Sequence, residues 1–560
     1  MASAPPNVPR SEWTPKLIQS LRGYTGRTFV ADLIAGVTVG FVALPLAMAF
    51  AISSGVGPQA GIYTAIVAGF LGSALGGSRL QITGPTGAFV VVVAGIVAKY
   101  GLGGLYLCTM LAGVILLVLG LTGLGTAVKY IPRPVVVGFT NGIAVLIAST
   151  QIKDFFGLQI DKVPSLFLDR LASIAGHWST LSLPATLLSA GALAVLVVFR
   201  QFIPKVPGAI VVLVLGTVIA VLFHLPIETI QTRFGGIPQG LPPLRMPEIE
   251  LGQFASLISP ALTVAMLGAI ESLMSAVVAD RMTQDKHNPN VELAAQGVAN
   301  MASPLFGGLP ATGAIARTAT NIRAGAKTPV AGIVHALTLV AILLFAAPLA
   351  GAIPLGVLAA ILMMVAYNMG EWREIPKILQ LARADVAVWF LTFMLTVFAD
   401  LTVAVEAGMI LAALLYILRV TNTTTVVEVT DNYVVEGEEH SLQGKDIPDG
   451  VAIYRIHGPF LFGSTDKLEV VTEGLDDLPP VVILRLRNMT AIDATGIQAL
   501  EDLAETLEAK GRHLVFCGMR PQPQSLMERA HFQRKLDARN ICPHVAAALE
   551  RARELLGERI

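Results

Sequence analysis

Two short segments combine Pro, Gly and Thr inside very apolar regions, and these residue types can build an anion site from main-chain amides. They are 82–88 (Ile-Thr-Gly-Pro-Thr-Gly-Ala) and 309–317 (Leu-Pro-Ala-Thr-Gly-Ala-Ile-Ala-Arg). Pro and Gly leave backbone groups without intrahelical partners, which hydrocarbon tolerates only where protein or a watery cavity satisfies them. We therefore predict two half-helices whose N-termini meet near the membrane midplane, where free N–H groups and positive dipole ends bind an anion.

The predicted backbone donors lie at the start of each half-helix, and they are Thr86, Gly87, Ala88, Gly313, Ala314 and Ile315. Arg317 follows Gly313 by about one helical turn, so its guanidinium could add fixed positive charge that attracts an oxyanion. The alternative role for Arg317 is an anchor on the cytosolic side, like Arg323. The alternative for both segments is ordinary glycine-rich helix packing, because membrane helices are generally rich in Gly and Pro.

Glu271 lies in the middle of another apolar run, 267–275. A charge at the bilayer centre costs about 2.5–3.5 kcal/mol even on the lenient insertion scale. This carboxyl group must therefore face a cavity, pair with a base or carry a proton. One interpretation is a carboxylate that couples transport to a proton or cation, and the other is a fixed ion pair with Arg317. The two roles are compatible.

The composition places the chain among polytopic membrane proteins. Hydrophobic residues make up 54% and charged residues 14%, whereas soluble chains carry roughly 25% charged residues. Up to about residue 420 the charges cluster between apolar runs, and beyond it they are spread as in a soluble domain. Its three cysteines fit no metal or disulfide pattern, and no cofactor is expected. The chain has no glycine-rich phosphate loop, which argues against an enzyme that hydrolyses nucleotides. No nucleic-acid partner is expected.

Twelve continuous apolar segments are long enough, or nearly long enough, to span a membrane: 32–53, 58–75, 102–121, 134–151, 184–199, 207–225, 257–279, 291–306, 330–347, 354–367, 386–399 and 402–418. Adding the two broken segments gives about fourteen spans.

The basic residues predict the orientation of these spans. If the N-terminal segment 1–31 is cytoplasmic, every second connection should be enriched in Lys and Arg. The connections expected inside hold Arg79, Lys129, Arg133, Arg200, Lys205, Arg281, Lys286, Arg323, Lys327, Arg373, Lys377, Arg383 and Arg419. The exceptions outside are Lys99 and the connections 152–183 and 226–250. Both termini are therefore expected in the cytoplasm. The polar start of the chain shows no cleavable signal, so the first span should be retained.

The broken segments are third and tenth in the count, which places them equivalently in two halves of seven. An odd-numbered half that is repeated once must be inverted in the membrane. Inverted repeats with broken helices point to a secondary transporter whose site lies at the repeat interface. A channel is the main competitor, since selectivity filters also use non-helical backbone.

The tail, 425–560, alternates strand and helix patterns, which predicts a small cytoplasmic α/β domain. Strands are expected at 451–457, 481–486 and 513–517, and helices at 495–510, 523–529 and 545–556. Within the membrane spans, Asn141, His335 and Glu406 are expected to serve packing or interfaces rather than the site.

Several motifs resemble the SulP (sulfate permease) family of anion transporters. They are Ala43-Leu-Pro-Leu-Ala-Met-Ala-Phe50, Gly84-Pro-Thr-Gly87, Gly307-Gly-Leu-Pro310, Arg317-Thr and Lys327-Thr-Pro329. The tail is similar to the family's STAS domain, with Asp493-Ala-Thr-Gly496 at its characteristic turn. The resemblance implies a transport domain over 32–420, with a core of spans 1–4 and 8–11 and a gate of spans 5–7 and 12–14. It further implies an elevator-like movement and a homodimer.

The resemblance also assigns roles to particular residues. Phe50 matches a position that lines the anion site in relatives. Glu271 matches an acidic position that helps bind Na⁺ as an aspartate in sodium-coupled bicarbonate carriers. Ser275 stands where a threonine is typical, and Ile315 replaces a threonine oxygen. Because Na⁺ needs a compact cage of oxygens, these departures favour proton coupling.

The sequence therefore predicts an inner-membrane carrier that moves a small anion by H⁺ symport. The motifs 76–79, 139–142 and 266–272 look most like a dicarboxylate branch, while sulfate and bicarbonate stay open. Alternatives are an anion channel, an uncoupled exchanger, a Na⁺-coupled bicarbonate symporter and a membrane-anchored signalling protein. In the tail, Thr495 matches a position that is phosphorylated in signalling STAS proteins, but Asp493 also fits a plain helix N-cap, which we favour. A cytoplasmic protein partner for the tail is compatible with either interpretation.

Overall fold

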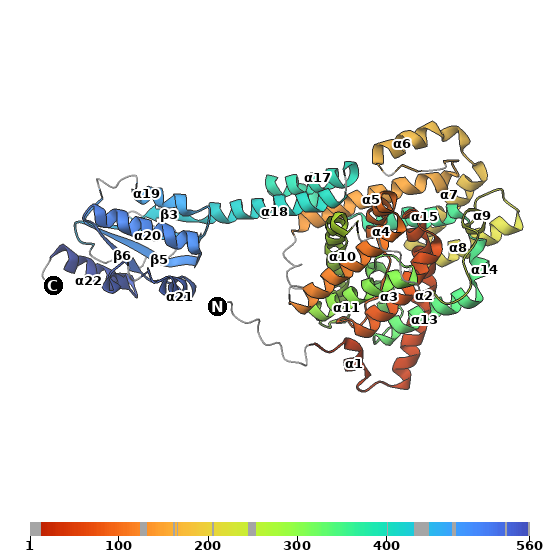
Figure 1. Cartoon of the computed structure of the whole chain (residues 1–560), viewed down its shortest axis with the longest axis horizontal. Coiled ribbons are helices and arrows are strands. Elements are labelled where there is room, and N and C mark those ends of the chain that lie inside the picture. The colour runs from red at the N-terminus through yellow and green to blue at the C-terminus, as the bar shows by residue number, and fades with distance from the viewer. Residues whose placement is uncertain are drawn as a thin grey trace. The chain divides into compact units, whose positions relative to one another are not determined.

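The computed structural model describes residues 13–123, 132–160, 163–164, 166–203, 207–244, 252, 254–399, 401–429, 447–472, 478–532 and 535–557. The chain divides into two compact units, Met1–Ile410 and Leu411–Ile560, whose elements are labelled in Figure 1.

The first unit is helical apart from two very short strands. Its elements are α1 (Lys16–Leu21), α2 (Gly26–Ser53), α3 (Pro58–Leu75), β1 (Thr83–Gly84), α4 (Gly87–Leu121), α5 (Arg133–Phe156), α6 (Phe167–Gly176), α7 (Leu183–Phe202), α8 (Gly208–Leu222), α9 (Ile230–Phe234), α10 (Phe254–Thr283), α11 (Pro289–Ala302), β2 (Thr312–Gly313), α12 (Ile315–Arg323), α13 (Val330–Phe345), α14 (Ala347–Gly351), α15 (Leu355–Met369), α16 (Ile375–Leu379) and α17 (Arg383–Phe398). Helix α18 (Leu401–Thr423) begins in this unit and ends in the next.

The predicted spans agree closely with these helices. Among the described residues, α2, α3, α4, α5, α7 and α10 are long and apolar enough to cross a membrane, and α8, α13 and α15 are shorter apolar helices. Helix α4 contains two predicted spans, because Gly101 takes a non-helical conformation with φ +70° inside it. The ninth span, 291–306, consists of α11 and a 3₁₀ turn, Ser303–Phe306. The structure confirms a multi-span helical membrane protein.

The helices of the first unit contact one another in two groups. Helices α2, α3, α4, α10, α11 and α13 pack together, and so do α5, α7, α8, α15 and α17. Between the groups, α2 contacts α15 and α8, and α4 contacts α5. The division of the spans into a core and a gate stays a prediction.

The two broken segments cross each other in antiparallel directions. Strand β1 pairs with β2, with Thr83 opposite Gly313 and Gly84 opposite Thr312. Helix α4 starts three residues after β1, and α12 starts two residues after β2. The antiparallel pairing is what an inverted repeat requires. We call Thr83–Gly87 with the start of α4 the first arm, and Thr312–Ile315 with α12 the second arm.

The sequence did not predict the short helices α6 and α9, which lie in the two connections that broke the positive-inside pattern. In α6, Arg170 is buried and donates to the Ser149 hydroxyl at 2.8 Å. In α9, Arg233 pairs with Asp154 at 2.8 Å and also with Glu228. Since these charges bind partners in the fold, they carry little information about orientation.

The second unit is a five-stranded sheet between helices. The strands are β3 (Thr425–Glu428), β4 (Val451–Phe460), β5 (Val481–Ile492), β6 (His513–Cys517) and β7 (Ile541–Cys542), in that spatial order. Only the β3–β4 pair is antiparallel. Helices α20 (Ala494–Ala509) and α21 (Pro521–Arg529) pack on one face, and α22 (Val545–Leu556) packs on the other. A short helix, α19 (Glu469–Thr472), follows β4. Apart from the unpredicted β3, β7 and α19, these elements match the sequence analysis.

Candidate functional site

Consecutive residues of α10 hold the two arms. The Thr86 hydroxyl of the first arm donates to Glu271 Oε2 at 2.8 Å. The Gly313 amide of the second arm donates to Ser272 Oγ at 3.0 Å, and Ser272 Oγ also lies 2.7 Å from the Thr312 hydroxyl. Because Glu271 and Ser272 are neighbours, Thr86 and Gly313 lie close together, as the sequence predicted.

Arg317 lies buried beneath the first arm, with 2% of its surface exposed. Its Nη2 donates to the Pro85 carbonyl, and its Nη1 has no hydrogen-bond partner among the described residues. A Cβ at Gly84 would lie 2.5 Å from Nη1, so a side chain there would displace the guanidinium group. The alternative of an exposed cytosolic anchor is therefore wrong for Arg317, whereas Arg323 on the same helix is exposed.

The alternative of a fixed ion pair between Glu271 and Arg317 is not found, since no salt bridge joins the two side chains. Glu271 binds the Thr86 hydroxyl, while Arg317 binds the carbonyl of the preceding residue, Pro85. Each charge thus has a polar partner at the same turn of the first arm. Two charged side chains, one from α10 and one from α12, fix the residues that lead into α4.

The predicted backbone donors differ between the arms. The amide of Gly313 donates to Ser272, and that of Ala314 donates to the Ile82 carbonyl at 2.8 Å. These two amides are therefore not free donors, which corrects the sequence prediction. No hydrogen bond joins the amides of Gly87 or Ala88 to a described residue, as expected in the first turn of a helix.

No side chain among the described residues caps α4 or α12. Thr86 is the N-cap residue of α4, but its hydroxyl is directed to Glu271 instead of the helix amides. Ala314 precedes α12 and has no side chain that could cap it. Ile315 is the remaining predicted donor of the second arm and is 38% exposed. The first amides of both helices, Gly87 and Ala88 in α4 and Ile315 and Ala316 in α12, therefore have no hydrogen-bond partner among the described residues.

Apolar side chains from three helices surround Gly87. A Cβ at Gly87 would meet Phe50 of α2 at 3.3 Å, Ile147 of α5 at 3.2 Å and Met369 of α15 at 3.2 Å. Phe50 therefore lies against the first arm, where the family resemblance put it. Ile147 and Met369 were missed, because an apolar residue in an apolar span gives no sequence signal. Since α5 and α15 belong to the second helix group, the site lies where the two groups meet.

Ser275 is buried within a separate pair of hydroxyl groups. Its Oγ lies 3.0 Å from the Thr318 hydroxyl, which also accepts a hydrogen bond from the Ile82 amide at 3.0 Å. Ser275 therefore joins α10 to α12 and to the segment before β1. No group of three or more His, Cys, Asp or Glu side chains that could hold a metal occurs among the described residues.

A polar stripe on α11, which the sequence analysis did not single out, supports both arms. Buried Glu292 accepts hydrogen bonds from the Ser78 amide and from Gln81 Nε2, each at 3.0 Å. Gln296 donates to the same carboxylate at 2.9 Å and to the Thr83 hydroxyl at 2.8 Å.

Asn300 continues this stripe and binds the chain just before β2. Its amide group accepts from the Ala311 N–H and donates to the Ala311 carbonyl, both at 2.8 Å. Glu292, Gln296 and Asn300 are spaced i, i+4, i+8, so they share one helix face. Polar residues at this spacing inside an apolar span could have been recognised in the sequence as candidates for a positioning role.

The remaining sequence predictions have mixed outcomes. Asn141 accepts from Trp389 at 3.1 Å, which confirms a packing role. Neither ring nitrogen of His335 has a hydrogen-bond partner among the described residues, so its predicted role in packing or at an interface is not supported by a hydrogen bond there. The Glu406 side chain lies outside the described residues. Asp493 accepts from the Gly496 amide at 2.9 Å and caps α20, as predicted.

Known proteins share this architecture. The sequence model of the Sulfate permease family matches residues 29–392, and that of the STAS domain matches residues 445–548. The chain is 41% identical over 525 residues to the "Putative sulfate transporter YvdB" of Bacillus subtilis, which covers 93% of this chain and 98% of that relative. It is 31% identical over 522 residues to the bicarbonate transporter BicA of Picosynechococcus, covering 90% of this chain and 91% of that one.

The fold matches that of murine Solute Carrier 26 family member A9, with a TM-score of 0.86 at 17% identity, covering 99% of this chain and 96% of the other. At this identity the likeness concerns the fold alone. The two relatives in sequence are named for sulfate and bicarbonate. The expected resemblance to a dicarboxylate branch gains no support from them.

Proposed function

The chain belongs to the sulfate permease family of anion transporters, and we propose that it carries a small oxyanion across the membrane by H⁺ symport. Sulfate is our first candidate because the 41% identical relative is named for it, and bicarbonate is the second. The third candidate substrate, a C4-dicarboxylate, is supported only by short sequence motifs. The observation that carries the proposal is the uncapped N-terminus of α4, which lies between Phe50 and the turn held by buried Arg317.

The anion would be held mainly by main-chain groups. The amides of Gly87 and Ala88 provide donors, and the helix dipole adds positive potential at the same point. Arg317 contributes a full charge from beneath Gly84 and Pro85. The apolar side chains of Phe50, Ile147 and Met369 around Gly87 would lower the local dielectric beside the anion, which strengthens each polar interaction.

Coupling would run through Glu271 and Thr86. Thr86 donates to Glu271 and is also the residue that precedes the first amides of α4. A proton on Glu271 Oε2 removes the acceptor that Thr86 uses, so protonation and anion binding act on the same turn. Ile315 supplies no side-chain oxygen for Na⁺, which favours H⁺ as the coupling ion.

The proposed movement is of the elevator type, with the group containing both arms sliding against the group containing α5 and α15. Gly87 contacts side chains from both groups, so relative sliding would change the walls of the site. We further propose a homodimer in the cell inner membrane with both termini in the cytoplasm. A protein partner of the STAS domain belongs to the same proposal.

Uptake by reconstituted protein tests the function. Labelled sulfate, bicarbonate and succinate are offered to proteoliposomes while H⁺ and Na⁺ gradients are imposed separately. We expect concentrative sulfate uptake with an inward H⁺ gradient and no Na⁺. Conductance without accumulation would instead support a channel, and counterflow that no cation gradient drives would support an exchanger.

A Na⁺-coupled bicarbonate symporter is the second candidate, because the 31% identical relative is named for bicarbonate. Accumulation of bicarbonate that requires Na⁺ at constant pH would establish it and overturn H⁺ coupling. Deleting residues 425–560 tests the signalling alternative. Full transport by the truncated chain would show that the tail is not needed for translocation.

A further inference from the structure

Helix α3 presents a row of small residues to the segment that leads into the first arm. The row consists of Ala65, Gly69 and Ser73, which are spaced i, i+4, i+8 and therefore share one helix face. All three are buried, and the proposed site uses none of them. We call these residues the α3 row. Small residues leave space beside a helix, and polar side chains from α12 and α13 occupy it here.

Arg317 of α12 and His335 of α13 lie along the α3 row, one helical turn apart. A Cβ at Gly84 would lie 2.5 Å from Arg317 Nη1 and 3.6 Å from the Ala65 Cα, so the guanidinium group is level with Ala65. A Cβ at Gly69 would lie 3.7 Å from His335 Nε2, so the ring is level with Gly69. Because Ala65 and Gly69 are four residues apart, the two levels are separated by about 6 Å along α3.

Ser73 continues the row toward the end of α3. A Cβ at Gly332, which precedes His335 by three residues on α13, would clash with Ser73 Oγ. The hydroxyl group is therefore directed at α13, on the side where His335 lies. In the proposed orientation α3 ends at Leu75 on the cytoplasmic side, so Ser73 is the member of the row nearest the cytoplasm.

The polar atoms along this row lack hydrogen-bond partners among the described residues. They are Arg317 Nη1, both ring nitrogens of His335, and Ser73 Oγ. None of the three residues is more than 3% exposed. A buried polar group without a partner costs free energy, and ordered water is what commonly binds such groups inside proteins. Three neighbouring side chains with this property indicate a site for a short chain of water molecules.

We propose that water joins Arg317, His335 and Ser73 into a path by which the symported proton leaves for the cytoplasm, with His335 as the proton acceptor. This inference rests on the proposed H⁺ symport. The proton would leave Glu271 Oε2 and pass through water to the unprotonated ring nitrogen of His335. The ring would then release the proton of its other nitrogen toward Ser73. Histidine suits this step because one ring nitrogen accepts while the other donates, and histidines inside membrane spans commonly serve proton relays.

The charge of Arg317 would make this path depend on the anion. A protonated His335 places a second positive charge about one helical turn from the guanidinium group, which costs free energy. Among the described residues, Arg317 is the charged group that acts on the ring, while Gly69 of α3 and Gly40 of α2 are its neighbours there. An anion bound above Arg317 offsets the charge. The proton would therefore reach His335 with the anion bound and would not leak without it, as symport requires.

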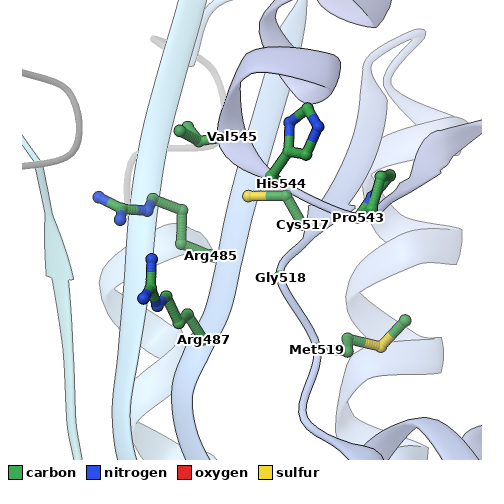
Figure 2. A pocket seen from close by; sticks show the side chains of 8 residues that line it. All are labelled: Arg485, Arg487, Cys517, Gly518, Met519, Pro543, His544 and Val545. Carbon is green, nitrogen blue, oxygen red and sulfur yellow. The ribbon is translucent and has the colours of Figure 1, made fainter.

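Solid-state NMR on the full chain in lipid bilayers tests the path without a transport assay. The nine histidines are labelled with ¹⁵N, and His335→Gln and His544→Gln identify two of the signals. Figure 2 shows His544 at a pocket of the STAS unit, where it is exposed, so it is the reference for a ring in contact with water. We expect magnetisation to pass from water to the His335 ring as it does to His544. Saturating sulfate should increase the protonated share of His335 at constant pH.

Proteoliposomes with a pH-sensitive dye inside measure whether the path carries protons. His335→Leu should slow net sulfate uptake and the accompanying acidification of the lumen by about tenfold, because a positioned proton acceptor accelerates proton transfer by at least this order. Counterflow of sulfate should keep its wild-type rate, since the proton can stay on Glu271 throughout an exchange. Ser73→Ala should show the same separation more weakly. Thr338→Val is the matched control, because this hydroxyl of α13 donates to its own helix at the Val334 carbonyl.

A structural role and a proton path give different results. Equal loss of net uptake and counterflow in His335→Leu would assign a structural role, and unchanged net uptake would show that the proton leaves by another route. Either result overturns the proposal. So does a His335 ring that receives no magnetisation from water, or that ignores sulfate, in a wild type that accumulates sulfate. If the wild type accumulates no sulfate under a proton gradient, H⁺ symport itself is wrong, and the path is overturned with it.

Discussion

The two arms occupy equivalent places in the repeats, yet their polar groups are used differently. In the first arm, the amides of Gly87 and Ala88 bind no described residue, and the N-cap hydroxyl of Thr86 is directed to Glu271. In the second arm, Gly313 and Ala314 already donate within the protein.

This difference indicates that the two inverted repeats have different roles, one in positioning an arm and the other in binding the anion. The second repeat supplies both charges that hold the first arm, since Glu271 lies on α10 and Arg317 on α12. We propose that the first repeat supplies the anion donors, because the N-terminus of α4 lies beside Phe50 and the turn that Arg317 holds. The following predictions test this division, starting with the largest expected effect.

Arg317→Met should reduce uptake by about a hundredfold. The variant removes the positive charge beneath the first arm and leaves the Pro85 carbonyl without its donor, and a hydrogen bond to a charged group is worth about 1.5–3 kcal/mol. Initial rates in proteoliposomes measure the effect. Arg323→Met, on the same helix but exposed, serves as the matched control. Equal loss in both variants would show that α12 needs only overall positive charge.

Glu271→Gln should abolish accumulation driven by a proton gradient while preserving counterflow of the anion. Glutamine can still accept from Thr86 but cannot take up a proton, so the ratio of internal to external anion should fall to about 1. Ser275→Ala is the comparison, because Ser275 contacts Thr318 and not the first arm. Accumulation that survives in Glu271→Gln would remove this residue from coupling.

Alanine substitutions at Gly313 and at Gly87 should affect the two arms differently. At Gly313 a Cβ would clash with Gln81 Nε2 and lie 3.1 Å from Ser272 Cα, so the residues that support the second arm must shift. We expect about a tenfold loss of uptake there. At Gly87 the contacts are 3.2–3.3 Å from flexible side chains, and we expect about a threefold rise in KM. A larger loss of uptake from alanine at Gly87 than at Gly313 would contradict the assignment of anion binding to the first arm and of support to the second.

Glu292→Gln should lower stability without removing the anion site. The carboxylate accepts from Ser78, Gln81 and Gln296, and an amide would turn a donor toward at least one of them. We expect the free energy of unfolding to fall by about 1–3 kcal/mol. The measurement is the midpoint of thermal unfolding, which should be lower in the variant. An unchanged midpoint would mean that the α11 stripe does not hold the arms.

The smallest effect should be a pH dependence at the far end of the second arm. Asp32 of α2 accepts from the Lys327 and Thr328 amides beyond α12, and Tyr24 donates to the same carboxylate at 3.1 Å. Burial, and then the Asp32 charge, raise the pKa of Tyr24 from 10.0 to about 12. Because the folded pKa is the higher one, this contribution to stability is complete below pH 10 and is lost as the pH rises toward 12.

Thermal midpoints of wild type and Tyr24→Phe, compared from pH 8 upward, measure this contribution. The difference between them should be largest near pH 8 and shrink at high pH. A difference that stays constant would show that the Tyr24 hydroxyl does not titrate with folding.

The sequence predicted the membrane spans well because their length and apolarity are set by the bilayer rather than by neighbours. It also located both arms, since Pro, Gly and Thr interrupt those spans at 82–88 and 309–317. The α/β fold of the tail could be predicted from its alternating strand and helix patterns. These features depend on local pattern.

The contacts within the site could not be predicted in the same way. An ion pair between Glu271 and Arg317 was one of two interpretations, but Glu271 accepts from Thr86 and Arg317 donates to the Pro85 carbonyl. Ser272 looks like any small residue of a membrane helix until β2 is placed against it. Which amide is free depends on how the arms pair, and pairing over two residues leaves no sequence signal.

The location of a bound oxyanion tests the central claim most directly. Selenate, a heavy-atom analogue of sulfate, can be found by anomalous scattering in crystals of the transporter. The account predicts a peak with its oxygens about 3 Å from the amides of Gly87 and Ala88, above the turn that Arg317 holds. A peak at the start of α12 with no contact to Gly87 would contradict it.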